Sequence, residues 1–517
     1  MNNSNTLRSL VVYAICVPLA LFVGYRLTDP MTYGTFGVVG LLALVMAFPL
    51  LMRWHQPLLL LSWNMAAIVF FFPGQPKLWL LMVVISLGVS ILHRAMSREA
   101  GFISVPQLTL PLVFLTAVVL ITAKLNGGIG LRLFGSDVYG GKRYIYLLGA
   151  IAGYFAFCAQ RIPKERASFY AGLFFIGGVT YMIGDLVLLG SPSLHYIFLV
   201  FPPSTVEAGA MELGTTRLTG MQGASAALVC FMLARYGIRG LLQMRRPWRL
   251  VAFLGFAALG LLSGFRSLVI LYLLIIAIQF YLEGLHHTRL LPLLLSVIVL
   301  AGAIVVPLAN KLPFTFQRAL AFLPVSIDPA AKYDAQASLD WRVRMWKAVL
   351  PQVPEHLWLG KGYALRVEDF DMLTGAGRML PTFAGFEENW LSALSGNYHN
   401  GPLSLLLPFG IWGAIGFVWF IIVSMRVTIA NFRYCPAEMR MLNSVVLSIF
   451  LARVLMFFFI YGSFGDEMYG FTGLVGLSVS LNGGVCRRTV EQPVELEPEE
   501  SGGFSAVLGG RRPAFLR

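Results

Sequence analysis

One histidine in a polar segment is the strongest candidate for proton-transfer chemistry. His399 lies in Gly396-Asn397-Tyr398-His399-Asn400-Gly401-Pro402, directly before an apolar stretch. A neutral imidazole can accept a proton from a hydroxyl group, since its unperturbed pKa is about 6.5. We therefore predict that His399 is a general base and that Asn400 supports it by orienting the ring or a substrate. The alternative is a helix-capping loop that happens to contain a histidine.

Three arginines could complement this base by binding an anion. Arg266 follows Leu262-Ser263-Gly264-Phe265 between two apolar stretches, Arg217 lies in Thr216-Arg217-Leu218-Thr219-Gly220, and Arg342 ends Ser338-Leu339-Asp340-Trp341-Arg342. Guanidinium groups bind phosphate through planar and often bidentate hydrogen bonds. Each arginine could instead be a snorkelling side chain or the partner of a carboxylate. Together with His399, they predict a site for a phosphate-bearing substrate.

A basic segment over 124–143 is a further candidate for anion binding. It contains Lys124, Arg132, Lys142 and Arg143, and pairs of glycines that allow close backbone approach. We predict that Lys142 and Arg143 support the site by holding an anionic headgroup. The alternative is that the two short apolar stretches on either side of this segment have been placed wrongly as membrane spans.

The composition identifies the environment that must position these residues. Of the 517 residues, 57% are hydrophobic and only 12% are charged, and the mean hydropathy is +0.74. Soluble domains carry about 25% charged residues, so a water-soluble globular fold is excluded, as are disordered and collagen-like chains. The five cysteines are scattered and form neither a metal-binding pair nor a disulfide framework.

The charges are distributed as the positive-inside rule requires. With the amino terminus inside, arginines gather in the predicted inner loops, and the outer loops are poor in Lys and Arg except for 124–143. The formal charge of +14 therefore reflects membrane topology and does not indicate a nucleic-acid partner. Both termini are predicted to be cytoplasmic.

The apolar stretches predict an all-α, polytopic membrane bundle of about 12–14 transmembrane helices. In the large outer loop, Ser338 is predicted to cap a helix with Leu339, Val343, Trp346 and Leu350 on one face. Arg453, inside a predicted span, is expected to pair with Asp185 or Glu467. The predicted parts are transmembrane helices over 1–189, an outer loop over 190–219, helices with the Arg266 turn over 220–308, a large periplasmic loop over 309–401, helices over 402–486 and a disordered cytoplasmic tail over 487–517.

These motifs, in this order, resemble the O-antigen ligase and O-antigen polymerase superfamily of bacterial envelope enzymes. The resemblance covers about 200–425 and rests on five motifs: Arg217-x-x-Gly220, Ser263-x-x-Arg266, the Ser338–Trp346 stretch, Leu359-Gly360-Lys361-Gly362, and His399-Asn400 before a span. After Gly220 the chain has Met221-Gln222-Gly223-Ala224, where family members often carry an Asn-Pro-Asn-like element.

The resemblance implies a metal-independent glycosyltransferase on the periplasmic face of the bacterial inner membrane, without a cofactor. Its donor would be a glycan on undecaprenyl pyrophosphate, and its acceptor a sugar hydroxyl on another glycan or on lipid A-core. His399 would be the catalytic base, and Arg266, Arg342 and Arg217 would bind the pyrophosphate. The implied context is cell-surface polysaccharide biosynthesis. The resemblance implies membrane lipids as partners, and a flippase and a chain-length regulator as candidate partners. Ligase and polymerase remain open alternatives.

A transporter or flippase of lipid-linked glycans is the main alternative to an enzyme. Such proteins often bind their cargo at the membrane midplane through broken helices and intramembrane charges. Here the polar residues concentrate in the predicted outer loops, which favours an enzyme at the membrane surface.

Overall fold

The computed structural model describes residues 3–29, 32–72, 74–96, 101–129, 140–203, 218–365, 396 and 398–488. Within these ranges the fold is all-α, apart from one isolated bridge between Ile68 and Lys77. Short 3-10 helices join some of the α-helices. In chain order the α-helices are α1 (Asn3–Leu27), α2 (Tyr33–Trp63), α3 (Leu78–Met96), α4 (Pro106–Leu125), α5 (Gly141–Phe157), α6 (Ala167–Ile176), α7 (Tyr181–Leu189), α8 (Thr219–Leu241), α9 (Trp248–Leu261), α10 (Arg266–Leu282), α11 (Leu290–Leu308), α12 (Phe314–Leu320), α13 (Pro329–Val349), α14 (Val353–His356), α17 (Gly401–Tyr434), α18 (Ala437–Phe459) and α19 (Phe464–Asn482).

The described helices confirm the all-α polytopic class. Seven helical segments are long and apolar enough to cross a membrane, and three shorter apolar helices accompany them. Helix α2 is one continuous helix over two successive apolar stretches of the sequence, 33–52 and the first part of 57–72. The apolar stretch over 168–189 is built from α6 and α7, joined by a 3-10 turn over Gly177–Thr180.

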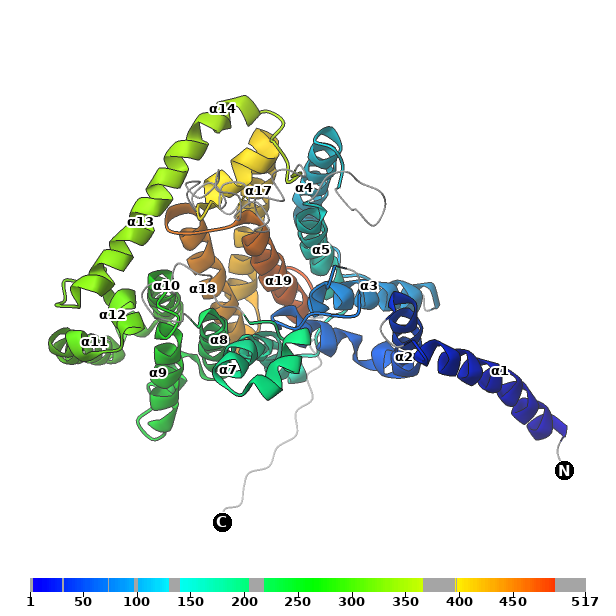
Figure 1. Ribbon diagram of the computed structural model, residues 1–517. Helices are drawn as coiled ribbons and strands as arrows, with labels where there is room; N and C mark the ends of the chain where they lie inside the picture. Colours follow the sequence, from blue (N-terminus) through cyan, green and yellow to red (C-terminus); the bar gives the residue numbers. More distant parts are fainter. Residues whose placement is uncertain are drawn as a thin grey trace, which may run out of the picture.

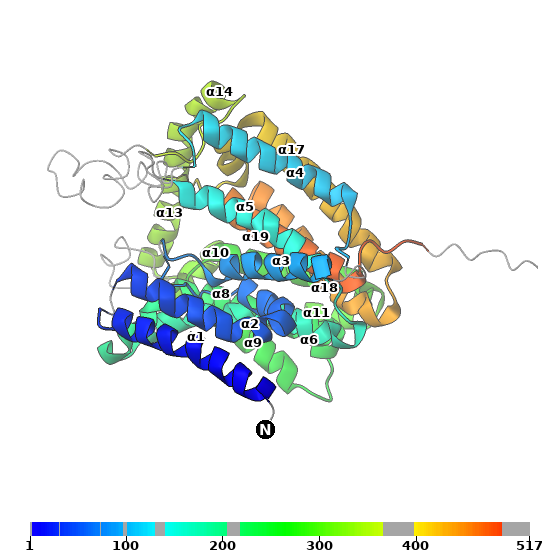
Figure 2. The same cartoon turned by 90° about the vertical axis from the view of Figure 1, so that its right-hand side faces the viewer.

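The centre of the molecule is a bundle in which α17, α18 and α19 lie beside α4 and α5 (Figure 1). After a quarter turn, α4 follows α17 and α5 follows α19 over much of their lengths (Figure 2). A Cβ atom at Gly476 would lie only 2.8 Å from the Cβ of Phe157, and one at Gly416 only 2.8 Å from the Cδ2 of Leu115. Small residues at these contacts let the helices approach closely, as is usual in membrane bundles.

An ion pair inside the bundle resolves the two alternatives for Arg453. Its Nε lies 3.0 Å from the Oε2 of Glu467 on α19, and the Nη2 of Arg453 lies 2.7 Å from the place where Gly470 would carry a Cβ. Asp185 instead accepts a hydrogen bond from the backbone N–H of Met221 at 3.2 Å. The pair thus joins α18 to α19, because a charge in an apolar bundle is costly unless it is neutralised.

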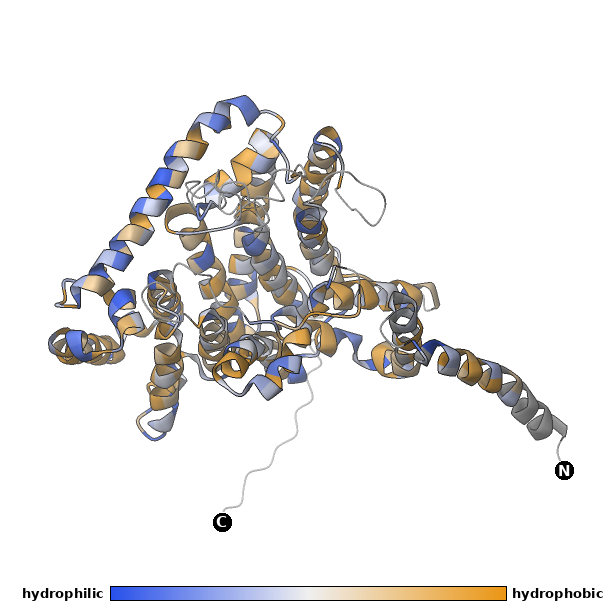
Figure 3. Ribbon diagram, in the orientation of Figure 1, coloured by the Kyte–Doolittle hydropathy of each residue, from blue (hydrophilic) through white to orange (hydrophobic). Residues whose placement is uncertain are grey.

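Helix α13 runs along one side of the bundle, from α12 to α14, and carries alternating polar and apolar residues (Figure 3). Its N-cap is Asp328, whose carboxylate accepts from the N–H of Ala330 at 2.8 Å, so the predicted cap at Ser338 is wrong. Met345 and Val349 pack with Leu403 and Leu407 of α17. Three residues of the predicted apolar face are instead exposed: Leu339, Val343 and Leu350. The helix begins about ten residues earlier than predicted, and its buried face is the one with Met345 and Val349, because packing against α17 decides which face is covered.

Candidate active site

The segment before α17 places His399 through contacts made by its two neighbours. The indole Nε1 of Trp346 on α13 donates to the carbonyl of Tyr398 at 2.7 Å. On the other side, Asn400 is the N-cap of α17, and its Oδ1 accepts from the N–H of Leu403 at 3.1 Å. His399 is therefore held between an anchored tyrosine and a helix cap, and Asn400 acts on it through the backbone.

The backbone of His399 is in the left-handed region, with a φ of 49°. Only one other non-glycine residue among the described ranges, Gln75, shares this feature. The left-handed conformation costs about 1–2 kcal/mol for a residue with a Cβ atom. Such strain persists only where surrounding contacts hold it, and it is concentrated at functional sites.

Two aromatic side chains enclose the imidazole. The ring of Trp341 lies 5.3 Å from that of His399, centre to centre, in an edge-on arrangement, and the ring of Tyr461 lies 5.4 Å away. Burial, and then the positive charge of Arg342, lower the pKa of His399 to about 4. The expectation of an ordinary pKa is therefore corrected. The imidazole is neutral at pH 7 and has a lone pair available for accepting a proton.

Arg342 lies on α13 one residue after Trp341, and it forms no ion pair with a carboxylate of the described residues. Its Nε is buried and has no hydrogen-bond partner in the described part of the chain. Burial lowers the pKa of Arg342, and the positive charges of Arg266 and Arg318 lower it further. We call these three residues the arginine cluster. Arg266 and Arg342 are half-buried like charges without a carboxylate partner among the described residues, so these two members of the cluster are electrostatically suited to an anion.

Arg266 and Arg318 fix the geometry of this cluster around the turn before α10. The Nη2 of Arg266 donates to the carbonyl of Ala335 on α13 at 3.0 Å. Arg318 on α12 forms an ion pair with Asp334 of α13, and its Nη1 donates to the carbonyl of Gly264 at 3.1 Å. The turn, α12 and α13 are thereby tied together, so the guanidinium groups of α10 and α13 face the same region.

The basic segment contributes one residue to this neighbourhood. The guanidinium of Arg143, in the first turn of α5, lies 5.5 Å above the ring of Tyr363, and a Cβ at Gly396 would lie 2.9 Å from its Nη1. Arg143 thus packs against the beginning of the His399 segment. Lys142 points elsewhere, since its Nζ lies 5.8 Å from the ring of Tyr146, which it shares with Lys77. Arg217 lies outside the described residues, as do 130–139 of the basic segment and the tail from 489.

The Gly360-Lys361-Gly362 turn is a packing element. The N–H groups of Lys361 and Gly362 donate to the carbonyls of Leu407 and Pro408 at 2.9 Å each. Both glycines have a positive φ, and a Cβ at Gly360 would overlap with the backbone of Pro408. This turn locks the loop onto α17 and brings the Nζ of Lys361 to 5.7 Å from the ring of Tyr398.

Four buried polar atoms on α13 and in the His399 segment have no hydrogen-bond partner among the described residues. They are Trp341 Nε1, Arg342 Nε, Tyr398 Oη and His399 Nδ1. Buried polar groups are almost always hydrogen-bonded, so such a group of them is typical of a site that receives a polar ligand. Donors on Trp341 and Arg342 next to an acceptor on His399 suit a substrate that has both hydroxyl and anionic oxygens.

Three residues of this arrangement were not found from the sequence: Arg318, Trp341 and Tyr461. Trp341 stands beside Arg342 in the chain, and that adjacency was the only available signal. Arg318 lies in a short helix and Tyr461 in the turn after α18. No sequence motif around either residue indicates a functional role.

Fold and site together define a polytopic, all-α membrane protein with a histidine and buried arginines gathered at one end of its bundle. Residues 250–418 match the model of the family described as O-Antigen ligase. The match confirms the resemblance to the O-antigen ligase and polymerase superfamily, and it includes Arg266, Arg342 and His399. No curated protein matches the chain. The family match supports a function of the O-antigen ligase or polymerase type, which is glycosyltransferase-like, in the inner membrane and with lipid-linked glycans as substrates.

Proposed function

We propose that this protein transfers a glycan from undecaprenyl pyrophosphate to the hydroxyl of an acceptor sugar on the periplasmic face of the inner membrane. The acceptor would be lipid A-core in a ligase or a second lipid-linked glycan in a polymerase. The observation that carries the proposal is a neutral imidazole, His399, beside the guanidinium of Arg342, which has no carboxylate partner among the described residues. A base next to an anion-binding group is what displacement of a pyrophosphate by a hydroxyl requires.

In the proposed reaction the acceptor oxygen attacks the anomeric carbon of the donor glycan. The bond between that carbon and the pyrophosphate oxygen breaks, and undecaprenyl pyrophosphate leaves with the electron pair. His399 takes the proton of the acceptor hydroxyl and then releases it to water. Because the pKa of free His399 is about 4, the ring is ready to accept a proton at neutral pH.

Arg266 and Arg342 would hold the pyrophosphate and stabilise the charge that grows on it. Arg217, which is outside the described residues, would be a third contact, and Arg143 would support the site from α5. Arg318 would act differently, since its charge is already neutralised by Asp334. Fixed donors aimed at developing charge supply much of the rate enhancement in group-transfer enzymes.

The direct test uses purified full-length protein with a defined lipid-linked glycan and its acceptor. We expect a lengthened or capped acceptor and one undecaprenyl pyrophosphate for each glycan transferred. We propose a mechanism without a metal ion, so EDTA should leave the rate unchanged. Loss of activity in EDTA would overturn that mechanism. If the protein moved the donor across vesicle membranes without forming product, it would be a flippase.

The proposed orientation places α13 and His399 on the periplasmic side and the ends of α8 and α10 in the cytoplasm. A cysteine at Gln336, exposed on α13, should react with a membrane-impermeant thiol reagent in intact spheroplasts. One at Met244, which is 78% exposed after α8, should react only after permeabilisation. The five native cysteines would first be replaced by alanine. The reverse labelling pattern would contradict the proposed location, because the donor glycan would then be on the wrong side.

A further inference from the structure

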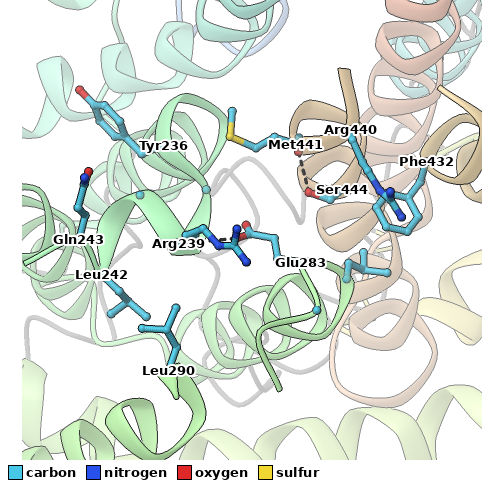
Figure 4. Close-up of a pocket in the computed structure, with 14 residues that line it drawn as sticks. Tyr236, Arg239, Leu242, Gln243, Glu283, Leu290, Phe432, Arg440, Met441 and Ser444 are labelled. Carbon is cyan, nitrogen blue, oxygen red and sulfur yellow. Dashed lines mark hydrogen bonds between the residues drawn. The ribbon is translucent and has the colours of Figure 1, made fainter. Parts of the chain in front are cut away.

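A cavity of about 940 Å³ lies at the end of the bundle opposite His399 (Figure 4). Its position follows from the helices that connect the two ends. Helix α10 begins at Arg266 in the arginine cluster and reaches the cavity at Leu282. Helix α17 begins beside His399 and reaches it at Phe432. The 17 residues of α10 alone span about 25 Å, so this distal cavity is separate from the candidate active site.

The distal cavity has an acidic residue whose charge is already engaged. Glu283 accepts hydrogen bonds from the N–H groups of Ile238 at 2.9 Å and Arg239 at 3.1 Å, and from Gln279 Nε2 at 2.9 Å. These backbone groups are available because α8 is broken at Gly237, where φ is 61° and a Cβ would lie 2.9 Å from Glu283 Oε1. Glu283 therefore caps a broken helix.

The positive charge of the distal cavity comes from two arginines. Arg239 and Arg440 both line it, and neither forms an ion pair with a carboxylate in the described ranges. Arg440 lies over the ring of Phe432, with its guanidinium carbon 5.5 Å from the ring centre. The hydroxyl of Ser444, which also lines the cavity, already donates to the carbonyl of Met441 at 2.7 Å, so the two guanidinium groups are the donors available to a ligand. This end of the cavity suits a phosphate group.

The rest of the lining is apolar, and it continues onto a helix that has no fully buried residue. Leu242, Leu290 and Met441 line the distal cavity. Leu290 is also the first residue of α11, whose 19 residues include none that is buried. Figure 1 shows α11 set apart from the central bundle, next to α12. Only Leu290 and Leu294, near the start of α11, pack against the core, so most of this apolar helix faces lipid and the cavity opens towards the acyl chains that surround it.

We propose that the distal cavity binds an anionic membrane phospholipid, with Arg239 and Arg440 on its phosphate and an acyl chain running from Leu290 along α11. The apolar lining and the continuity with α11 favour a lipid over a soluble phosphate compound. Juxtamembrane arginines attract anionic headgroups. The inference is independent of the reaction proposed for His399.

Native mass spectrometry of the full-length protein released from detergent tests this proposal. Phosphatidylglycerol should be retained in preference to phosphatidylcholine with the same acyl chains. The double variant Arg239→Gln, Arg440→Gln should bind phosphatidylglycerol about 30-fold more weakly, and each single variant about fivefold, since each arginine near an anionic headgroup contributes on the order of 1 kcal/mol. The matched control is Arg245→Gln, Arg246→Gln, which removes two exposed charges near α8 that do not line the cavity.

Four outcomes would overturn the proposal. Equal retention of the two lipids by the wild type would exclude recognition of the anionic headgroup. Equal losses in the cavity variant and the control would indicate diffuse surface attraction. A rise in melting temperature with inorganic phosphate as large as that with phosphatidylglycerol would indicate a site for a soluble phosphate. Single variants that bind as the wild type does would exclude Arg239 and Arg440 as the contacts.

Discussion

Replacing His399 by alanine is expected to lower glycan transfer by about 10²–10⁴-fold, the usual contribution of a general base. The protein should still insert into the membrane and bind the lipid-linked donor, because we assign the pyrophosphate to the arginines. The measurement is the initial rate of acceptor modification by purified protein, together with donor binding. Asn400→Ala is the comparison: it removes the cap on α17, which is worth about 1 kcal/mol of stability, and should lower the rate less.

The pH dependence separates a base from a positioning residue. Burial and the charge of Arg342 hold the pKa of free His399 at about 4. Protonation removes the accepting lone pair, so kcat/KM, which reports groups of the free enzyme, should stay level from about pH 8 to about pH 5 and fall as the pH drops through about 4. Because the pKa of His399 is lowered, the active, neutral form predominates above a pH of about 4 and is lost below it. Normal transfer by His399→Ala would refute the assignment.

Replacing Arg266 by alanine is expected to reduce transfer by about 10²–10³-fold, as when one donor to a developing negative charge is removed. Arg266→Lys should keep only part of the activity, because lysine retains the charge but loses the planar fork of donors. The rate should be measured at equal amounts of folded protein. The melting temperature should be recorded beside it, since Arg266 also donates to the carbonyl of Ala335 and helps to hold α13.

Arg344→Ala is the matched control for this charge. Arg344 is exposed on α13, two residues from Arg342, and therefore on another face of the helix. The Arg344→Ala substitution also removes one positive charge near the site but leaves the arginine cluster intact, so transfer should stay close to that of the wild type. If Arg266→Ala transferred glycan normally, Arg266 would serve only to anchor the turn before α10. Equal losses in Arg266→Ala and Arg344→Ala would indicate a general field effect in place of a specific contact.

The contacts of individual side chains show why a local sequence pattern does not predict the arrangement of the site. For Arg453 the sequence allowed both Asp185 and Glu467, and only the packing of α18 against α19 selects Glu467. Lys142 and Arg143 are adjacent and looked equivalent. The rotation of α5 sends Arg143 towards Tyr363 and Gly396 and Lys142 towards Tyr146. Helical rotation of about 100° per residue separates neighbours in this way, but its absolute phase depends on contacts distant in the chain.

The sequence by itself determined the membrane class, the helical architecture, the turn before Arg266 and the polar segment of His399. These features depend on hydropathy and on local backbone preferences, which act over a few residues. Only the tertiary structure brought Arg266, Arg342 and His399, which lie up to 133 positions apart in the chain, to one end of the bundle. It also added Arg318, Trp341 and Tyr461 and lowered the pKa of His399, because burial and the proximity of charges arise only when distant segments pack together.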